Sequence, residues 1–373
     1  METWTINLIT VFVLCVFLAG VMIPKILLIS FRKNLFDEVD ERKIHKGAVP
    51  RLGGLAFSPV IFFSIALVLG VNIIMGKADN ILHLDEVVVE MIFELCALLM
   101  LYVVGMADDL IGVKYSAKFF VQIMCGILLV FGGIYIDNLH GLLGIYELPT
   151  WIGYALTVLV IVFFTNAINL IDGVDGLASG LSIAALIVYT YSFIVLDYYI
   201  YGALAIAFLG VLVPFYYYNV FGKADKQKKI FMGDTGSLTL GFALSFLSIK
   251  LLGCIETNTE GLPNPFALAF APMLVPCLDV MRVFFRRIRH HKSPFLPDRT
   301  HIHHKLMALG LTSRVTMVTV VGFAIVLTIG NIEISKFINV NILLLFNLIG
   351  WILLNMWLTK SVLKKNKESD FSK

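Results

Sequence analysis

Charged residues are scarce in this chain of 373 residues, where Asp, Glu, Lys and Arg together make up 15% of the sequence. Soluble domains carry about 25% charged residues. The deficit runs along the whole length, and hydrophobic residues reach 59% with a mean hydropathy of +0.89. A soluble domain with one large core is therefore excluded, and the composition indicates a polytopic membrane protein.

Three further absences narrow the class. The net charge of +3 is too small to indicate a nucleic-acid partner. The first apolar run, residues 4–30, lacks a basic leader and is too long for a signal-peptide core, which predicts an uncleaved span. The cysteines form no CxxC pair and no zinc-like spacing with histidine, so we expect small core residues at Cys15, Cys96, Cys125, Cys254 and Cys277.

Long apolar runs are what the sequence does contain. A helix needs about 20 apolar residues to cross a bilayer, and these runs lack the alternation of barrel strands. We therefore predict an all-α integral membrane protein with about eleven spans in a single domain, residues 1–373, without internal repeats. The predicted spans are 4–30, 54–75, 89–107, 117–136, 151–171, 177–196, 199–218, 236–254, 264–285, 315–332 and 337–359.

Basic residues concentrate in the connections on one side of the predicted membrane. Nearly all fall in alternate connections and in the C-terminal tail, and only Lys77, Lys250 and Lys336 lie in the other set. The positive-inside rule then predicts a cytoplasmic C-terminus and an N-terminus outside. Runs such as "KADKQKK" and "KKNK" we interpret as orientation signals.

The polar motifs fall on this same side. The outer connections are short and carry no comparable motif. We therefore expect an active site on the cytoplasmic face, formed by the loops 31–53, 108–117, 168–176, 219–236 and 286–314.

Five aspartates border the membrane at predicted helix ends: Asp108, Asp109, Asp172, Asp175 and Asp234. Carboxylates placed there cost free energy unless a positive charge compensates them. Bunched oxygen ligands without cysteine suit Mg²⁺ or Mn²⁺ rather than zinc. Two plainer interpretations stay open: Asp-Gly pairs that only turn a loop, and a cap of the following helix by Asp234 or by the threonine after it.

The segment "NLIDGVDG" carries Asn169, Asp172 and Asp175 at intervals of three residues. Consecutive members of such a series can share one face of a helix. The glycines after the two aspartates permit a tight turn or the close approach of a ligand to the backbone.

The segment "DRTHIHHKLMALG", residues 298–310, predicts a short amphipathic helix that its last glycine ends. At about 100° per residue, His301 and His304 share a face with Lys305 while His303 points away. This disfavours a metal site of three histidines. Beside Arg299, the histidines suit an anion instead, and a basic helix on anionic lipid is the alternative.

Five segments, in order along the chain, together resemble the polyprenyl-phosphate N-acetylhexosamine-1-phosphate transferases of bacterial membranes. They are "RKIHKGAVPRLGG", "DDLIG", "NAINLIDGVDGLASG", "FMGDTGSLTLG" and "DRTHIHHKL". The resemblance implies an Mg²⁺-dependent enzyme of the bacterial cytoplasmic (inner) membrane. Its substrates would be a UDP-N-acetylhexosamine and undecaprenyl phosphate, its products UMP and the lipid-linked sugar that starts a cell-envelope polysaccharide. Members often form homodimers.

Two alternatives accompany this resemblance. The sequences "VPRLGG" and "HIHH" resemble the branch that uses UDP-GlcNAc, whereas the branch that loads N-acetylmuramoyl-pentapeptide typically has "TPTMGG" and three consecutive histidines. A secondary transporter of nucleotide or lipid-linked sugars is the rival from another class. Transporters usually place ionisable residues near the midplane of the membrane. Charged residues are nearly absent inside the spans predicted here, and the main exceptions are Glu94, Asp279 and Arg282.

The resemblance also implies roles for the acidic residues. Asp234 is expected to bind Mg²⁺ together with Asp108 or Asp109, and Asp109 is a candidate base on the lipid phosphate. A base contributes little, because the second pKa of a phosphate monoester is about 6 and the nucleophile is already ionised. Asn169, Asp172 and Asp175 are expected to contact the nucleotide, and we also count Asp172 among the catalytic residues.

Cationic side chains complete the expected site. Lys118 would suit the lipid phosphate, and Arg51, which adjoins a glycine pair, is expected to contact substrate. The diphosphate of the donor would be held by His301, His303, His304 and Arg299.

Overall fold

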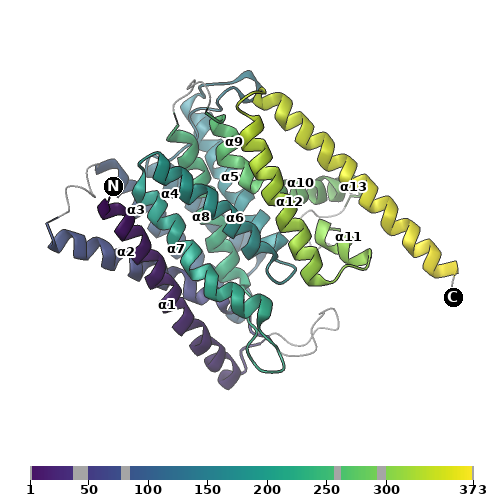
Figure 1. Cartoon of the computed structure of the whole chain (residues 1–373), viewed down its shortest axis with the longest axis horizontal. Helices are drawn as coiled ribbons and strands as arrows, with labels where there is room; N and C mark the ends of the chain where they lie inside the picture. Colours follow the sequence, from purple (N-terminus) through teal and green to yellow (C-terminus); the bar gives the residue numbers. More distant parts are fainter. Residues whose placement is uncertain (1, 37–48, 77–84, 256–261, 292–299, 372–373) are drawn as a thin grey trace.

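The computed structural model describes residues 2–36, 49–76, 85–255, 262–291 and 300–371 (Figure 1). Within these ranges it contains no strand, and the pair Asn138 and Glu147 forms only an isolated β-bridge. The prediction of an all-α fold is confirmed. The helices are α1 (Glu2–Lys33), α2 (Phe57–Ile74), α3 (Asp85–Ile111), α4 (Tyr115–Phe131), α5 (Thr150–Ile171), α6 (Leu177–Val195), α7 (Tyr199–Tyr216), α8 (Gly233–Gly253), α9 (Pro265–Phe270), α10 (Leu274–Arg289), α11 (Ile302–Ala308), α12 (Ser313–Ile334) and α13 (Val340–Phe371).

Ten helical segments in the described ranges are long and apolar enough to cross a bilayer, so the protein is a polytopic membrane protein. One of them, Pro265–Arg289, joins α9 and α10 through a short 3-10 turn at Ala271–Met273. The proline in this turn cannot donate a backbone hydrogen bond, which explains why the helix is interrupted there.

The one remaining predicted span, 117–136, corresponds to α4, which is apolar but only 17 residues long. This length is at the lower limit for a spanning helix, about 17 residues. Gly132 and Gly133 end the helix, and Gly133 has a φ of +85°. The chain continues to Ile136, whose N–H donates to Thr157 Oγ1 on α5 at 2.8 Å. The shortened helix and the segment after it together cover the predicted span.

Hydrogen bonds divide the bundle into two ends. At one end, which we call the polar end, the last turn of α3 binds the first turn of α8, and the loop after α5 binds the segment between α7 and α8. At the opposite end, His140 Nε2 lies 3.2 Å from the carbonyl oxygen of Leu252, and Asn341 Nδ2 donates to the carbonyl oxygen of Gly141. The first residues of α1 lie at this opposite end, because Asn72 near the end of α2 donates to Asn7. The last helix, α13, ends on the side of the polar end (Figure 1).

Helix α8 forms the centre of the molecule and packs mainly against α3 and α5. Every residue from Thr235 to Leu252 is buried except Lys250. Small residues permit this close packing, since a Cβ added at Gly241 would lie 2.8 Å from Thr165 Cα on α5. The first turn of α8 is therefore held rigidly at the polar end.

The cysteine prediction is confirmed only in part. Cys15, Cys125 and Cys277 are buried, and Cys254 is half-buried. Cys96 is exposed on α3, so its assignment as a core residue is wrong. An apolar run in a membrane protein covers lipid-facing and core-facing positions alike, and its composition does not distinguish them.

Candidate active site

The first and fourth motifs form one backbone unit at the polar end. The N–H groups of Gly53 and Gly54 donate to the carbonyl oxygens of Phe231 and Met232, each at 2.9 Å. A Cβ added at Gly54 would lie 2.0 Å from the backbone nitrogen of Gly236. Glycine is required there because no side chain fits between the two backbones.

Asp109 binds the N-terminus of α8. One carboxylate oxygen accepts the N–H of Asp234 at 2.7 Å, and the other accepts the N–H and the hydroxyl of Thr235 at 2.9 and 2.5 Å. Residue Met232 precedes the helix and makes no side-chain cap. The interpretation of Asp234 or Thr235 as the cap is therefore wrong, because both lie inside the helix and Asp109 of α3 supplies the cap.

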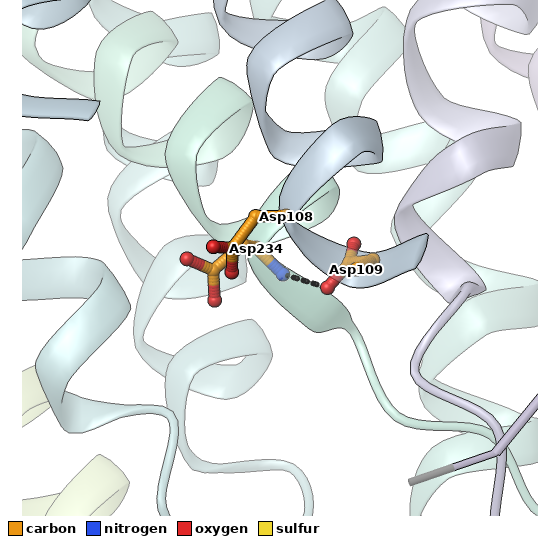
Figure 2. Close-up of side chains that lie close together, drawn as sticks. All are labelled: Asp108, Asp109 and Asp234. Atoms are coloured by element: carbon orange, nitrogen blue, oxygen red, sulfur yellow. Dashed lines mark hydrogen bonds between the residues drawn. The ribbon is translucent and has the colours of Figure 1, made fainter. Parts of the chain in front are cut away.

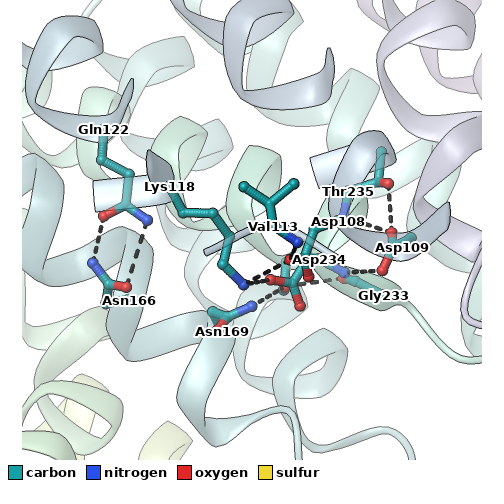
Figure 3. Close-up of polar contacts among 11 residues, drawn as sticks. Asp108, Asp109, Val113, Lys118, Gln122, Asn166, Asn169, Gly233, Asp234 and Thr235 are labelled. Carbon is teal, nitrogen blue, oxygen red and sulfur yellow. Dashed lines mark hydrogen bonds and ion pairs between the residues drawn. The ribbon is translucent and has the colours of Figure 1, made fainter. Parts of the chain in front are cut away.

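Asp108 and Asp234 share one lysine (Figure 3). Lys118 Nζ lies 3.2 Å from Asp108 Oδ1 and 2.7 Å from Asp234 Oδ2. Asp108 also accepts the N–H of Val113 at 2.8 Å. Lys118, predicted from its place after the aspartate pair, thus brings the second and fourth motifs together by charge.

The three carboxylates of Asp108, Asp109 and Asp234 lie close together (Figure 2). Each offers an oxygen within 4.8 Å of the oxygens offered by the other two. Such a set of hard oxygen donors suits a divalent cation. Since both oxygens of Asp109 already accept hydrogen bonds from α8, Asp108 and Asp234 are the better fitted to hold one.

The series Asn169, Asp172 and Asp175 does not share a helical face. Helix α5 ends at Ile171, and the two aspartates lie in the turn before α6. Only Asn169 remains helical, and its Nδ2 donates to Ser237 Oγ of α8 at 2.8 Å. The face prediction fails because the aspartates and glycines end the helix instead of continuing it.

Asp172 has a strongly perturbed carboxyl group. Burial raises its pKa to about 7, and the negative charges of Asp175, Asp234 and Asp109 add to this rise while Arg51 opposes it. Asp172, in the third motif, is therefore close enough to the metal-suited carboxylates and to Arg51 of the first motif for their charges to affect its pKa. Arg51 itself is exposed.

Lys229 is a site residue that sequence reasoning missed. Its side chain is 9% exposed, and its Nζ lies 2.5 Å from Asp175 Oδ2. Beside this pair, Asn219 accepts the N–H of Gly176 at 2.7 Å and donates to the carbonyl oxygen of Ile230 at 2.9 Å. The run "KADKQKK" indicates an orientation signal, and only the position of its last lysine next to "IFMGD" distinguishes Lys229 from the others.

The three histidines are neighbours. The rings of His301 and His303 are stacked with centroids 5.7 Å apart, and those of His303 and His304 lie 4.2 Å apart. The expectation that His303 points away from His301 is wrong. His301 precedes helix α11 with a ψ of 157°, so the helical rotation that separates the two does not apply to it.

His303 connects the fifth motif to the third. It is 1% exposed, and a Cβ added at Gly173 would lie 2.7 Å from its Nε2. Burial lowers its pKa to about 3, and the nearby His304 and His301 add to this fall, so the ring is neutral at physiological pH. In the described part of the chain neither ring nitrogen of His303 has a hydrogen-bond partner.

Asp279 on α10, which the sequence shows only as a charge inside a predicted span, contacts the histidine motif. Its carboxylate is fully buried and lies 2.8 Å from His301 Nδ1 and 2.9 Å from an Arg282 guanidinium nitrogen. The signal in the sequence is one acidic residue in the apolar run "MLVPCLDVM". Arg299, expected beside these residues, lies outside the described ranges.

Comparison with known proteins identifies a family and relatives that are similar to this chain. The family model described as glycosyl transferase family 4 matches residues 91–252. The "Probable undecaprenyl-phosphate N-acetylglucosaminyl 1-phosphate transferase" of Bacillus subtilis (strain 168) is 32% identical over 352 residues, which cover 91% of this chain and 90% of that protein. The "Undecaprenyl-phosphate alpha-N-acetylglucosaminyl 1-phosphate transferase" of Escherichia coli O157:H7 is 28% identical over 91% of this chain and 89% of its own length.

The similarity thus reaches well beyond the region of the family model and includes the first motif at one end of the chain and the histidine motif near the other. A relative more than 30% identical across nine-tenths of both chains shares the family. This protein belongs to glycosyl transferase family 4.

Proposed function

We propose that this protein transfers N-acetylglucosamine-1-phosphate from UDP-GlcNAc to undecaprenyl phosphate and releases UMP, on the cytoplasmic face of a bacterial inner membrane. The relatives named above support the acceptor and the transferred group. The observation that carries the proposal is the polar end, where three carboxylates offer oxygens within 4.8 Å of one another and Lys118 bridges two of them.

The donor set fits a magnesium ion. Asp108 and Asp234 would hold it, since one lysine balances only part of the charge of these two carboxylates, whereas the oxygens of Asp109 are engaged by α8. When bound, Mg²⁺ neutralises and orients the phosphate oxygens of the substrates.

The remaining chemistry is positioning. An oxygen of the lipid phosphate forms the new bond to the phosphorus that carries the sugar, while the bond from this phosphorus to the oxygen of UMP breaks. Because the lipid phosphate is largely dianionic at neutral pH, its approach to the donor diphosphate is opposed mainly by charge repulsion. Lys118 is the cation beside the metal-suited carboxylates, and it suits the incoming phosphate.

The donor would lie between the third and fifth motifs. Asn169, Asp172 and Asp175 suit contacts with the nucleotide, and the histidines beside Gly173 suit the diphosphate. The direct contact of His303 with Gly173 supports this assignment, because it joins the segments that must hold the two parts of one substrate.

Release of UMP by the purified protein in detergent tests the proposal. We expect UMP only when UDP-GlcNAc and undecaprenyl phosphate are both present, loss of the reaction with EDTA, and recovery with Mg²⁺ or Mn²⁺. UDP-GalNAc and UDP-MurNAc-pentapeptide serve as competing donors, and we expect slower turnover with each. Failure to form UMP, or uptake of a nucleotide sugar into vesicles without UMP formation, would contradict the proposal.

A further inference from the structure

Asp279 makes more polar contacts than its place inside an apolar helix leads one to expect. Its carboxylate oxygens lie 2.8 Å from His301 Nδ1, 2.9 Å from Arg282, and 3.1 and 3.3 Å from the N–H of Ile302. Arg282 also donates to the carbonyl oxygen of Thr300. Asp279 is fully buried, so it acts only on these neighbours.

These contacts fix both the position and the tautomer of His301. An ionised carboxylate can only accept hydrogen bonds, so Nδ1 must carry a proton and donate it to Asp279. Nε2 is then the nitrogen left for other contacts. Stacking on His303 with an angle of 6° between the rings sets the plane in which Nε2 points.

The orientation of His301 bears on the substrate site. His303, on which it stacks, lies against Gly173, the residue next to Asp172. The histidine rings therefore stand beside the stretch assigned to the nucleotide. A ring that turned about its Cβ–Cγ bond would remove Nε2 from this position without changing the backbone.

We propose that Asp279 is a positioning residue of the transferase reaction, which holds His301 so that its Nε2 contacts the diphosphate sugar of the donor. The inference rests on the proposed function, because its readout is the turnover of UDP-GlcNAc. It differs from a purely structural role, in which Asp279 only fixes the start of α11 through Ile302 and Arg282.

A double-mutant cycle separates the two roles. Asparagine at position 301 places an N–H close to that of Nδ1 and can still donate to Asp279, but it lacks Nε2. We expect His301→Asn and Asp279→Asn each to lower kcat/KM for UDP-GlcNAc by about tenfold or more, with little change in the KM for undecaprenyl phosphate. In the His301→Asn background, Asp279→Asn should cost less than about threefold further, because its effect passes through the missing nitrogen.

Glu90→Gln is the matched control, since Glu90 is another buried carboxylate with a cationic partner, Lys250 Nζ at 2.7 Å, at the opposite end of the bundle. It should lower the thermal unfolding midpoint and leave the KM for UDP-GlcNAc unchanged. The inference is overturned if Asp279→Asn retains full activity, or if it costs the same factor in both backgrounds.

Folding is checked by monodispersity and thermal unfolding in detergent. If Asp279→Asn does not fold, Asp279→Glu is measured in the same two backgrounds and judged by the same comparison. If neither variant folds, Asp279 is a structural residue and the inference is wrong. A wild-type protein without UMP release would instead reject the proposed function itself.

Discussion

At the scale of the residue, two aspartates of the same cluster do different work. Asp109 accepts three hydrogen bonds from the first turn of α8, whereas Asp234 has its side chain directed at Lys118. Asp109 therefore secures the helix that carries Asp234. Neighbouring carboxylates in a metal-suited cluster need not all be ligands.

We expect Asp234→Asn to lower kcat by about a hundredfold or more with little loss of stability, because it weakens metal binding. Asp109→Asn should instead lower the free energy of unfolding by about 1–3 kcal/mol, because an amide replaces one of the accepting oxygens with a donor. Steady-state UMP release and thermal unfolding of both variants check this contrast. Equal loss of stability in the two variants would contradict the division of roles.

Asp172 gives a prediction with a defined pH dependence. Burial raises its pKa from its ordinary value of 3.8 to about 7, so the folded state binds this proton more tightly than the unfolded chain does. Its contribution to stability is full below about pH 4 and is lost as the pH rises through about 7. Asp172→Asn carries no such charge, so its unfolding midpoint should exceed that of the wild type by more at pH 8.5 than at pH 5.5, by about a few degrees.

The measurement is made in EDTA, since a bound cation would itself favour the ionised carboxylate. A difference between Asp172→Asn and the wild type that does not change with pH would show that Asp172 does not titrate in this range.

At the scale of the element, close backbone contacts at glycine hold the polar end together. We expect Gly54→Ala to destabilise the protein by about 3 kcal/mol or more and to reduce activity, because its Cβ would lie 2.0 Å from Gly236 of α8. Gly70→Ala is the matched control, as no atom lies within 4 Å of its added Cβ on α2. It should stabilise by up to about 1 kcal/mol. Similar stability of the two variants by thermal unfolding would contradict this account.

Helices were easier to predict from sequence than contacts between them. The runs of apolar residues located the described spanning helices, and most helix ends lie within a few residues of the predicted ones, because crossing a bilayer requires a long apolar stretch. Helix α4 is shorter than predicted, since glycines end it early, and α13 is longer, since it continues past the predicted end at 359 to Phe371. The prediction that His303 points away from His301 is wrong because it assumes that both residues are helical, whereas His301 precedes α11.

For the candidate site, too, the sequence predicts the residues better than it predicts the contacts between them. The sequence indicates the carboxylates and histidines as site residues, through their residue types and through the resemblance to a family. The structure brings Asp108, Asp109 and Asp234 together. Their partners depend on tertiary packing, which no spacing encodes. The sequence therefore predicts only an orientation signal at Lys229 and an isolated charge at Asp279, although each pairs with a residue more than 20 positions away.

At the scale of the molecule, the two ends of the bundle differ in chemistry. The polar end gathers the motifs, and the opposite end carries the N-terminus and the loop before α5. The distribution of basic residues predicts that the polar end is cytoplasmic.

Cysteine labelling in intact cells checks this orientation. In a background without the five native cysteines, Lys226→Cys at the polar end should resist a membrane-impermeant maleimide, and Tyr146→Cys at the opposite end should react. Both side chains are exposed, so accessibility to the reagent depends on the compartment and not on burial. Labelling of Lys226→Cys before the membrane is permeabilised would reverse the proposed orientation.

The central position of α8 also has a consequence for biosynthesis. Polar groups on earlier helices bind to this helix: Asp109 to its first turn, Asn169 to Ser237, and Glu90 to Lys250 as well as to Tyr201 of α7. In a nascent chain that has already inserted α3 and α5 into the bilayer, these groups lack their partners on α8 until α8 leaves the ribosome and inserts. Translation that stops before Gly233 would leave Glu90 without its cationic partner and Asp109 and Asn169 without the bonds to α8, and we expect such fragments to be cleared by membrane proteases rather than to persist.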